Sequence, residues 1–238
     1  MQRLQQGLTA IFGFATGALL VLLALYLWPF AFESRDPVAL AAINGVADRE
    51  SFALNITADN ILATHGGAFP FKPFPASLTV MKDLALHDVF ALLTKFRAGP
   101  NGEVIGFGTE LEIAHGDSSL LRGLFMTHTL WSIVVPGRGT LHLYQVENNW
   151  RLLKRVVLPM LLTGRPFSGI FTGVNTLGPL PGYRGIVVGG TREFAGLAGS
   201  FVEIGTLREL RPDGTVSGQM ELRVGYDPAR GVITPSGK

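Results

Sequence analysis

Five polar residues in the middle of the chain could do chemistry, because strand alternation sorts them into small groups. Glu110 and Glu112 share one strand face, His128 lies on the next stretch, and His142 and Tyr144 share a face of the third. If these faces line a barrel, they place a few polar groups in a mostly apolar cavity, the usual composition of a small-molecule site. If they face outward, they are solvated surface. Both interpretations stay open for His142 and Tyr144, whereas Glu112 is expected on the surface.

The sequence predicts neither a metal site nor a cofactor. Of the five histidines, only His128 and His142 lie on neighbouring predicted strands, and the spacing supplies no third ligand. The chain has no His-Glu-x-x-His motif, phosphate loop, Gly-x-Ser-x-Gly elbow or acid-rich calcium loop. No catalytic residue is therefore assigned, and no nucleic-acid partner is expected.

Strands separated by turn residues must position these groups. The pattern predicts strands over 104–115, 124–135 and 139–147, with a Pro-Gly-Arg-Gly hairpin turn at 136–139. A first strand is predicted over 51–59, and further strands over 167–174 and 218–224. The chain is therefore expected to be mainly β and antiparallel.

Residues 183–210 join two strand-like runs through a glycine-dense corner. The run 186–188 is β-branched, and the two glycines after it permit a turn where a Cβ would clash. This stretch resembles the allene oxide cyclase and dirigent β-barrel superfamily, in which a Gly-Gly-Ser/Thr corner leads through a Phe and small residues to a Gly that opens the next strand. Arg192 stands where a glycine is often found. The matching residues are Gly189, Gly190, Thr191, Phe194, Gly196, Ala198 and Gly199.

A second stretch with the same resemblance runs from Phe107-Gly108-Thr109 through a polar loop to a strand led by Gly123. The resembling segments together cover about residues 104–224. The resemblance implies an antiparallel β-barrel. Cyclases of this superfamily use a buried carboxylate and a few polar groups to steer a reactive apolar substrate, and dirigent proteins hold radical intermediates. The matching positions here are turn and core residues, so no catalytic residue carries over.

The N-terminus predicts an uncleaved membrane anchor. Residues 8–32 carry no charged side chain, and a helix needs about 20 apolar residues to span a bilayer. The run ends in bulky residues, unlike the small-residue cleavage site of a signal peptide. Arg3 on the near side favours a cytoplasmic N-terminus, which places the rest of the chain on the periplasmic side of the inner membrane.

Thr9, Gly13 and Gly17 recur every four residues on this predicted helix. Such a small-residue stripe permits close packing with a second helix, from a membrane-protein partner or a second copy, although glycine is also common in membrane helices generally. The expected organisation is an anchor over 1–32, a linker over 33–50 and a barrel domain over 51–238.

Two helices are predicted to decorate the barrel. Residues 83–97 place apolar side chains at helical spacing, between Asp83 and a Gly-Pro pair. Residues 150–162 combine a basic face with an apolar face, which suits either a membrane surface or a segment packed on the outside of the barrel. The packed segment is favoured because Pro159 should kink or end the helix.

These features favour a membrane-anchored extracytoplasmic barrel that binds an apolar small molecule, as an isomerase or cyclase of a lipid-like or polyketide-like substrate. The alternative is a non-catalytic accessory subunit of a larger membrane complex. Nothing in the sequence identifies the substrate.

Overall fold

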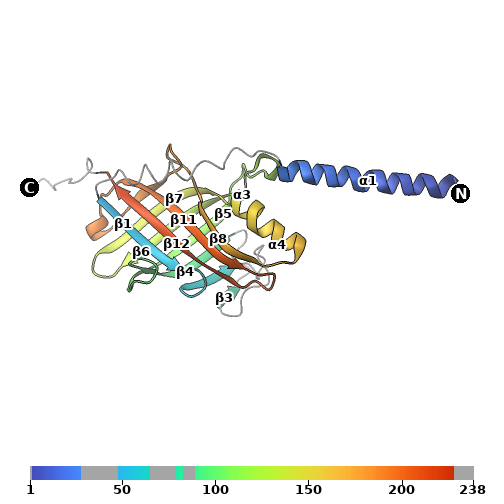
Figure 1. The fold of residues 1–238 in the computed structure, drawn as a ribbon. Coiled ribbons are helices and arrows are strands. Elements are labelled where there is room, and N and C mark those ends of the chain that lie inside the picture. The colour runs from blue at the N-terminus through green and yellow to red at the C-terminus, as the bar shows by residue number, and fades with distance from the viewer. Residues whose placement is uncertain (1, 28–47, 65–78, 83–88, 228–238) are drawn as a thin grey trace, which may run out of the picture.

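The structure is a computed structural model that describes residues 2–27, 48–64, 79–82 and 89–227 (Figure 1). Three short helical turns accompany the regular elements: Leu120–Arg122, Leu153–Val157 and Arg192–Phe194. In chain order the elements are α1 Gln2–Leu27, β1 Asp48–Asn55, β2 Asn60–Thr64, β3 Thr79–Lys82, β4 Val89–Arg97, β5 Val104–Ala114, β6 Met126–Val135, β7 Gly139–Asn148, α3 Trp150–Leu152, α4 Leu158–Thr163, β8 Phe167–Val174, β9 Thr176–Gly178, β10 Gly185–Gly190, β11 Gly199–Leu210 and β12 Val216–Tyr226.

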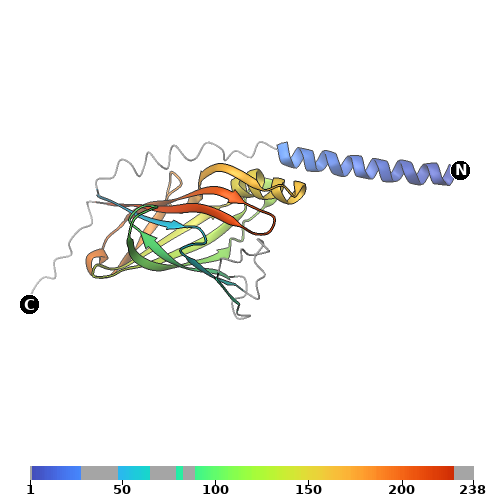
Figure 2. The same cartoon turned by 60° about the horizontal axis from the view of Figure 1, so that its bottom comes forward.

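Eight of the described strands close into an antiparallel barrel (Figures 1 and 2). Their order is β1–β12–β11–β10–β7–β6–β5–β4, and the ring closes where Ala53 of β1 pairs with Arg97 of β4. The short strands β2 and β3 continue the sheet from β4. The predicted antiparallel barrel is therefore confirmed.

Between β7 and β11 the wall of the barrel is built from short strands. At one end β10 pairs with both β7 and β11. Toward the other end β9 pairs with β7, and β8 pairs with β11. At Asn175 the chain passes from β8, which pairs with β11, to β9, which pairs with β7. This crossing places Asn175 and Thr176 beside the inward-facing residues of β7 and β11.

Apolar side chains fill one end of the barrel. The Phe96 ring contacts the rings of Phe52 and Trp131 edge to face, with centroids 5.9 and 5.7 Å apart. Such aromatic pairs stabilise a core beyond the area that they bury. Other fully buried members of this core are Leu54, Ile133, Leu141, Leu143, Phe194, Phe201, Leu222 and Val224.

Two glycines of the corner after β10 allow strands to approach closely. A Cβ on Gly190 would lie 2.2 Å from the carbonyl oxygen of Thr140, and a Cβ on Gly199 would lie 2.1 Å from that of Gly225. Both contacts are with backbone atoms, which cannot turn aside. The glycines are therefore required by the spacing of the strands.

We expect Gly199→Ala to destabilise the barrel by more than about 1 kcal/mol, because the added methyl group forces β11 away from β12. Gly116→Ala is the matched control, since a Cβ at Gly116 meets no atom within 4 Å. Urea unfolding of both variants in mild detergent measures the difference. Equal stability of the two variants would contradict the close approach.

The predicted helix over 83–97 is wrong for its described part, because Val89–Arg97 is strand β4. Leu92, Thr94 and Phe96 alternate as buried residues with exposed ones, which is the two-residue period of a strand. The apolar residues on both faces imitate helical spacing. The segment pairs with β5 along its whole length and with β2 near its start, and these backbone hydrogen bonds stabilise the strand over a helix.

Residues 150–163 are helical and lie on the outside of the barrel (Figures 1 and 2). Val156, Val157 and Met160 pack against Leu207 and Leu210 of β11. Pro159 does not end the helix. It lies in the first turn of α4, directly after the π-helical turn Leu153–Val157, where a missing backbone N–H is tolerated.

The helix α1 covers Gln2–Leu27, and its described side chains, residues 11–23, are exposed. A Cβ on Gly13 or Gly17 would meet no described atom within 4 Å. In the part of the chain that the structure describes, no helix combines the length and apolarity needed to cross a membrane. Residues 28–47 of the predicted anchor and linker lie outside the described residues, and β1 begins inside the predicted linker, at Asp48.

Candidate functional site: a buried carboxylate cluster

Four glutamates point into the barrel at the end away from the apolar core. Glu110 and Glu112 come from β5, Glu147 from β7 and Glu203 from β11. Glu110, Glu147 and Glu203 are at most 3% exposed, and their carboxylate oxygens lie within 4.8 Å of one another. Glu112 lies two residues farther along β5 from the apolar core and is only partly buried. We call these four residues the carboxylate cluster.

Glu203 is held by three donors. The Nε2 of Gln145 lies 2.6 Å from its carboxylate, the Nδ2 of Asn175 lies 3.0 Å away and the indole Nε1 of Trp131 lies 3.2 Å away. The hydroxyl of Thr176 donates to Oε1 of Gln145 at 2.6 Å, which fixes the orientation of this amide so that its NH₂ faces the carboxylates. Hydrogen bonds of this kind favour the ionised form of Glu203.

The other carboxyl groups of the cluster receive fewer hydrogen bonds. Glu147 accepts from Nε2 of Gln145 at 2.6 Å and from Nδ2 of Asn149 at 3.4 Å. Among the described residues, no N–H donor reaches the carboxyl of Glu110, whose pKa is shifted by burial and charge alone. The cluster is therefore asymmetric, with most of its donors on Glu203.

Burial raises the pKa of every carboxyl group in the cluster, because desolvation penalises the charged form. The pKa of Glu110 and of Glu147 lies well above the usual range, by burial first and then by the charges of neighbouring glutamates, and for Glu147 the hydrogen bond from Asn149 opposes part of the shift. Burial also raises the pKa of Glu203, but its hydrogen bonds oppose the shift. Burial and the charge of Glu203 raise the pKa of Glu112 to about 8.

These shifts give the cluster both a proton donor and a proton acceptor. Burial raises the pKa of Glu110 well above its usual range, which favours the neutral acid, while the donors around Glu203 favour its carboxylate. Neighbouring groups whose environments separate their pKa values are the arrangement that acid and base catalysts use. Glu112 can exchange a proton near neutral pH, where general acid–base catalysis is most effective.

The carboxylate oxygens of the cluster are also candidate metal ligands. Glu110, Glu147 and Glu203 are the described residues that could hold a metal ion, and oxygen ligands suit hard cations. However, the NH₂ of Gln145 already points at the carboxylates of Glu147 and Glu203. The arrangement as it stands therefore suits shared protons better than a cation.

The sequence-predicted site residues lie on two sides of the barrel wall. Glu110 is inside. His128 and Tyr144 lie together on the outer face, with Nδ1 of His128 2.7 Å from the Tyr144 hydroxyl, and His142 lies 2.7 Å from the hydroxyl of Ser132. Burial and the neighbouring His115 lower the pKa of His128. These outer residues do not meet Glu110.

Sequence reasoning missed Glu147, Glu203 and Gln145. A signal for Gln145 and Glu147 exists, because they share one face of β7 with Leu141 and Leu143, which are fully buried. Glu112 was expected on the surface, whereas it shares the inward face of Glu110. A glutamate in an alternating pattern is normally assigned to the solvent side, and a polar barrel interior reverses this rule.

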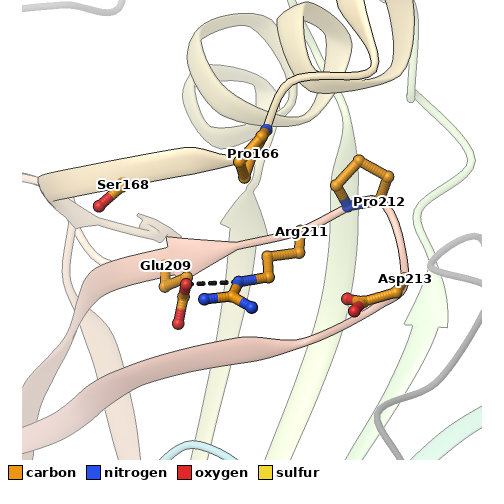
Figure 3. Close-up of a pocket in the computed structure, with 6 residues that line it drawn as sticks. All are labelled: Pro166, Ser168, Glu209, Arg211, Pro212 and Asp213. Atoms are coloured by element: carbon orange, nitrogen blue, oxygen red, sulfur yellow. Dashed lines mark hydrogen bonds and ion pairs between the residues drawn. The ribbon is translucent and has the colours of Figure 1, made fainter.

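A shallow hollow of about 480 Å³ lies outside the cluster, between the start of β8 and the β11–β12 turn (Figure 3). The ion pair between Arg211 and Glu209, at 2.6 Å, crosses it. It is open to solvent, and its charged groups are already paired or exposed. The hollow is lined by Pro166, Ser168, Glu209, Arg211, Pro212 and Asp213.

The sequence matches no known protein-family model. It also matches no curated protein. Solved structures similar to this chain include a pyocyanin demethylase, with a TM-score of 0.37 and 12% identity over 76% of this chain and 100% of the other. A pterocarpan synthase dirigent protein gives a TM-score of 0.38 and 9% identity over 75% and 94% of the two chains. The Diels-Alderase AbmU from Streptomyces koyangensis gives 0.38 and 13% over 87% and 88%.

The similar structures include dirigent proteins, the group that the corner sequence resembles. With TM-scores below 0.5, these likenesses carry no weight for the site, which is inferred from the residues of this chain alone.

The raised pKa of Glu112 makes stability depend on pH. In the unfolded chain this carboxyl titrates near 4.5, and in the folded barrel near 8. Below pH 4.5 Glu112 is protonated in both the folded and the unfolded chain, so it adds no pH dependence there. Between these values the folded state holds more protons, so stability falls as pH rises, by about 1.4 kcal/mol per pH unit for each proton.

We therefore expect the free energy of unfolding to decrease from pH 5 to pH 8 and to decrease less steeply in Glu112→Gln. Urea titrations at several pH values measure it. The exposed Glu103→Gln serves as the control and should keep the wild-type slope. Stability that rises over this interval in the wild type would contradict the raised pKa.

Proposed function

We propose that this protein is a membrane-anchored β-barrel enzyme that binds an apolar small molecule at the carboxylate cluster and isomerises or cyclises it by proton transfer. The observation that carries the proposal is the group of four glutamates with raised pKa values at one end of a barrel whose other end is filled by apolar side chains. Maintaining this group is costly, because each carboxyl is desolvated. A functional role accounts for that cost.

Each glutamate has a part in the proposed reaction. Glu112 is partly exposed and has a pKa of about 8, so it exchanges a proton with the bound molecule. Glu110 and Glu147 hold protons in the interior, and Glu203 takes up the compensating charge. Isomerisation and cyclisation by this route remove one proton and return one, so the cluster ends the cycle with the same number of protons.

An apolar ligand fits the surroundings of the cluster. Trp131 of the apolar core donates to Glu203, so the cluster borders buried aromatic and aliphatic side chains. A neutral ligand also leaves the protonated carboxyls uncharged, whereas an anion would be repelled by Glu203. These features favour a lipid-like or polyketide-like molecule.

A neutral apolar fluorophore, N-phenyl-1-naphthylamine, tests the site without knowledge of the substrate. We expect its affinity for the wild type to be constant up to pH 7 and to fall about fivefold as pH rises through 8, because an apolar molecule bound beside ionised Glu112 would remove water from the charge. Glu112→Gln should bind equally well at all these pH values, and Glu103→Gln should follow the wild type. An unchanged pH dependence in Glu112→Gln would remove Glu112 from the site.

Anchoring is the second part of the proposal. The uncharged run over 8–32, of which α1 includes residues 8–27, supports it. We expect the native protein to remain in the membrane pellet after alkaline carbonate extraction, and mass spectrometry to find residues 8–32 on the mature chain. A mature N-terminus beyond Phe32 would contradict the anchor.

An accessory subunit remains the second candidate function, favoured by the apolar outer face of β4, β5 and β6. Large exposed apolar side chains in one patch mark interaction surfaces. Co-purification in mild detergent separates the candidates: a chain that migrates alone and still binds the fluorophore supports the enzyme. The exposed apolar residues of this face are Leu93, Phe107, Leu111, Ile113, Leu130 and Val134.

A further inference from the structure

Two segments at the carboxylate end of the barrel expose pairs of leucines. Leu120 and Leu121 lie in the short turn between β5 and β6 and are 54% and 67% exposed. Leu161 and Leu162 lie in the last turn of α4 and are 62% and 82% exposed. Side chains of this size are rarely left in water in adjacent pairs without a partner surface.

Hydrogen bonds hold these two segments to the same end of the barrel. The amide of Asn148 donates to the carbonyl of Gly123 at 3.1 Å, and the backbone N–H of Asn149 donates to that of Phe125 at 2.8 Å. Asn148 directly follows Glu147 of the carboxylate cluster, and the last turn of α4 lies beside the end of β11, because Met160 packs with Leu210. The exposed leucines therefore flank the end of the barrel that contains the cluster.

The helical segment that carries Leu161 and Leu162 is basic, whereas the neighbouring β11–β12 turn carries both signs, with Glu209, Arg211 and Asp213. The segment 150–165 contains Arg151, Lys154, Arg155 and Arg165 and no acidic residue. Arg122 adds a basic residue to the β5–β6 loop, where Asp117 is the acidic one. Leucines projecting from a segment rich in Lys and Arg are characteristic of helices that lie in the interface of an anionic membrane.

We infer that the exposed leucine pairs and the basic residues beside them dock the barrel, with its carboxylate end toward the lipid, on the anionic surface of the bilayer that holds α1. This inference rests on the proposed anchor and deepens the proposed function, since it gives an apolar substrate a route from the lipid to Glu112. The chain between Leu27 and Asp48 can span at most roughly 75 Å. The tether therefore keeps the barrel near the surface at a high effective concentration.

The absence of cysteine from the chain makes the test direct. Leu121→Cys and Leu162→Cys each receive a nitroxide label in the full chain, which is incorporated at one copy per nanodisc. Val188→Cys is the matched control, because Val188 is 60% exposed on β10, beside the end of the barrel that the apolar core fills. Relaxation of the label by oxygen, which partitions into lipid, is compared with relaxation by a water-soluble nickel chelate.

In nanodiscs that contain phosphatidylserine, we expect labels at 121 and 162 to be at least threefold less accessible to the nickel chelate than the label at 188. Neutral phosphatidylcholine should reduce this protection, since it lacks the negative charge that the arginines bind. Equal nickel accessibility at all three positions would overturn the inference while leaving the anchor intact. A chain that does not enter nanodiscs at all would instead contradict the anchor.

Discussion

Burial of four carboxyl groups at one end of the barrel is the constraint on which the rest of this structure depends. Three of them lie within 4.8 Å of one another, a distance at which they cannot all be ionised in a desolvated site. The carboxyls differ in their hydrogen bonds: among the described residues, three donors contact Glu203 and none contacts Glu110. The result is a set of carboxyls whose raised pKa values favour the protonated form, beside one whose hydrogen bonds favour the charged form.

The fold supplies what this arrangement needs. The apolar core at the other end fixes Trp131, whose indole N–H reaches Glu203. The division of the wall between β8 and β9 brings Asn175 and Thr176 inside, where they orient Glu203 and Gln145. A continuous strand at this position would direct alternate side chains outward. The irregular part of the barrel is thus the part that builds the site.

The barrel could be predicted from the sequence because local signals and strand pairing agree. The alternation over 104–115 and the glycine corner before Gly199 both became the expected strands. Residues 89–97 were misassigned because apolar residues on both faces of β4 imitate a helix, and only pairing with β5 separates the two. Glu147 and Glu203 could not be predicted as partners of Glu110, since strands far apart in the chain meet only when the barrel closes.

Infrared difference spectroscopy of the carboxyl C=O stretch tests the central claim most directly, because protonated carboxylic acids absorb where carboxylates do not. At pH 7 the wild type should show a protonated-carboxyl band, part of which disappears as pH rises through 8. Glu110→Gln should weaken the protonated-carboxyl band, and Glu112→Gln should lose the component that titrates near pH 8. A wild-type spectrum without any protonated carboxyl at pH 7 would contradict the account.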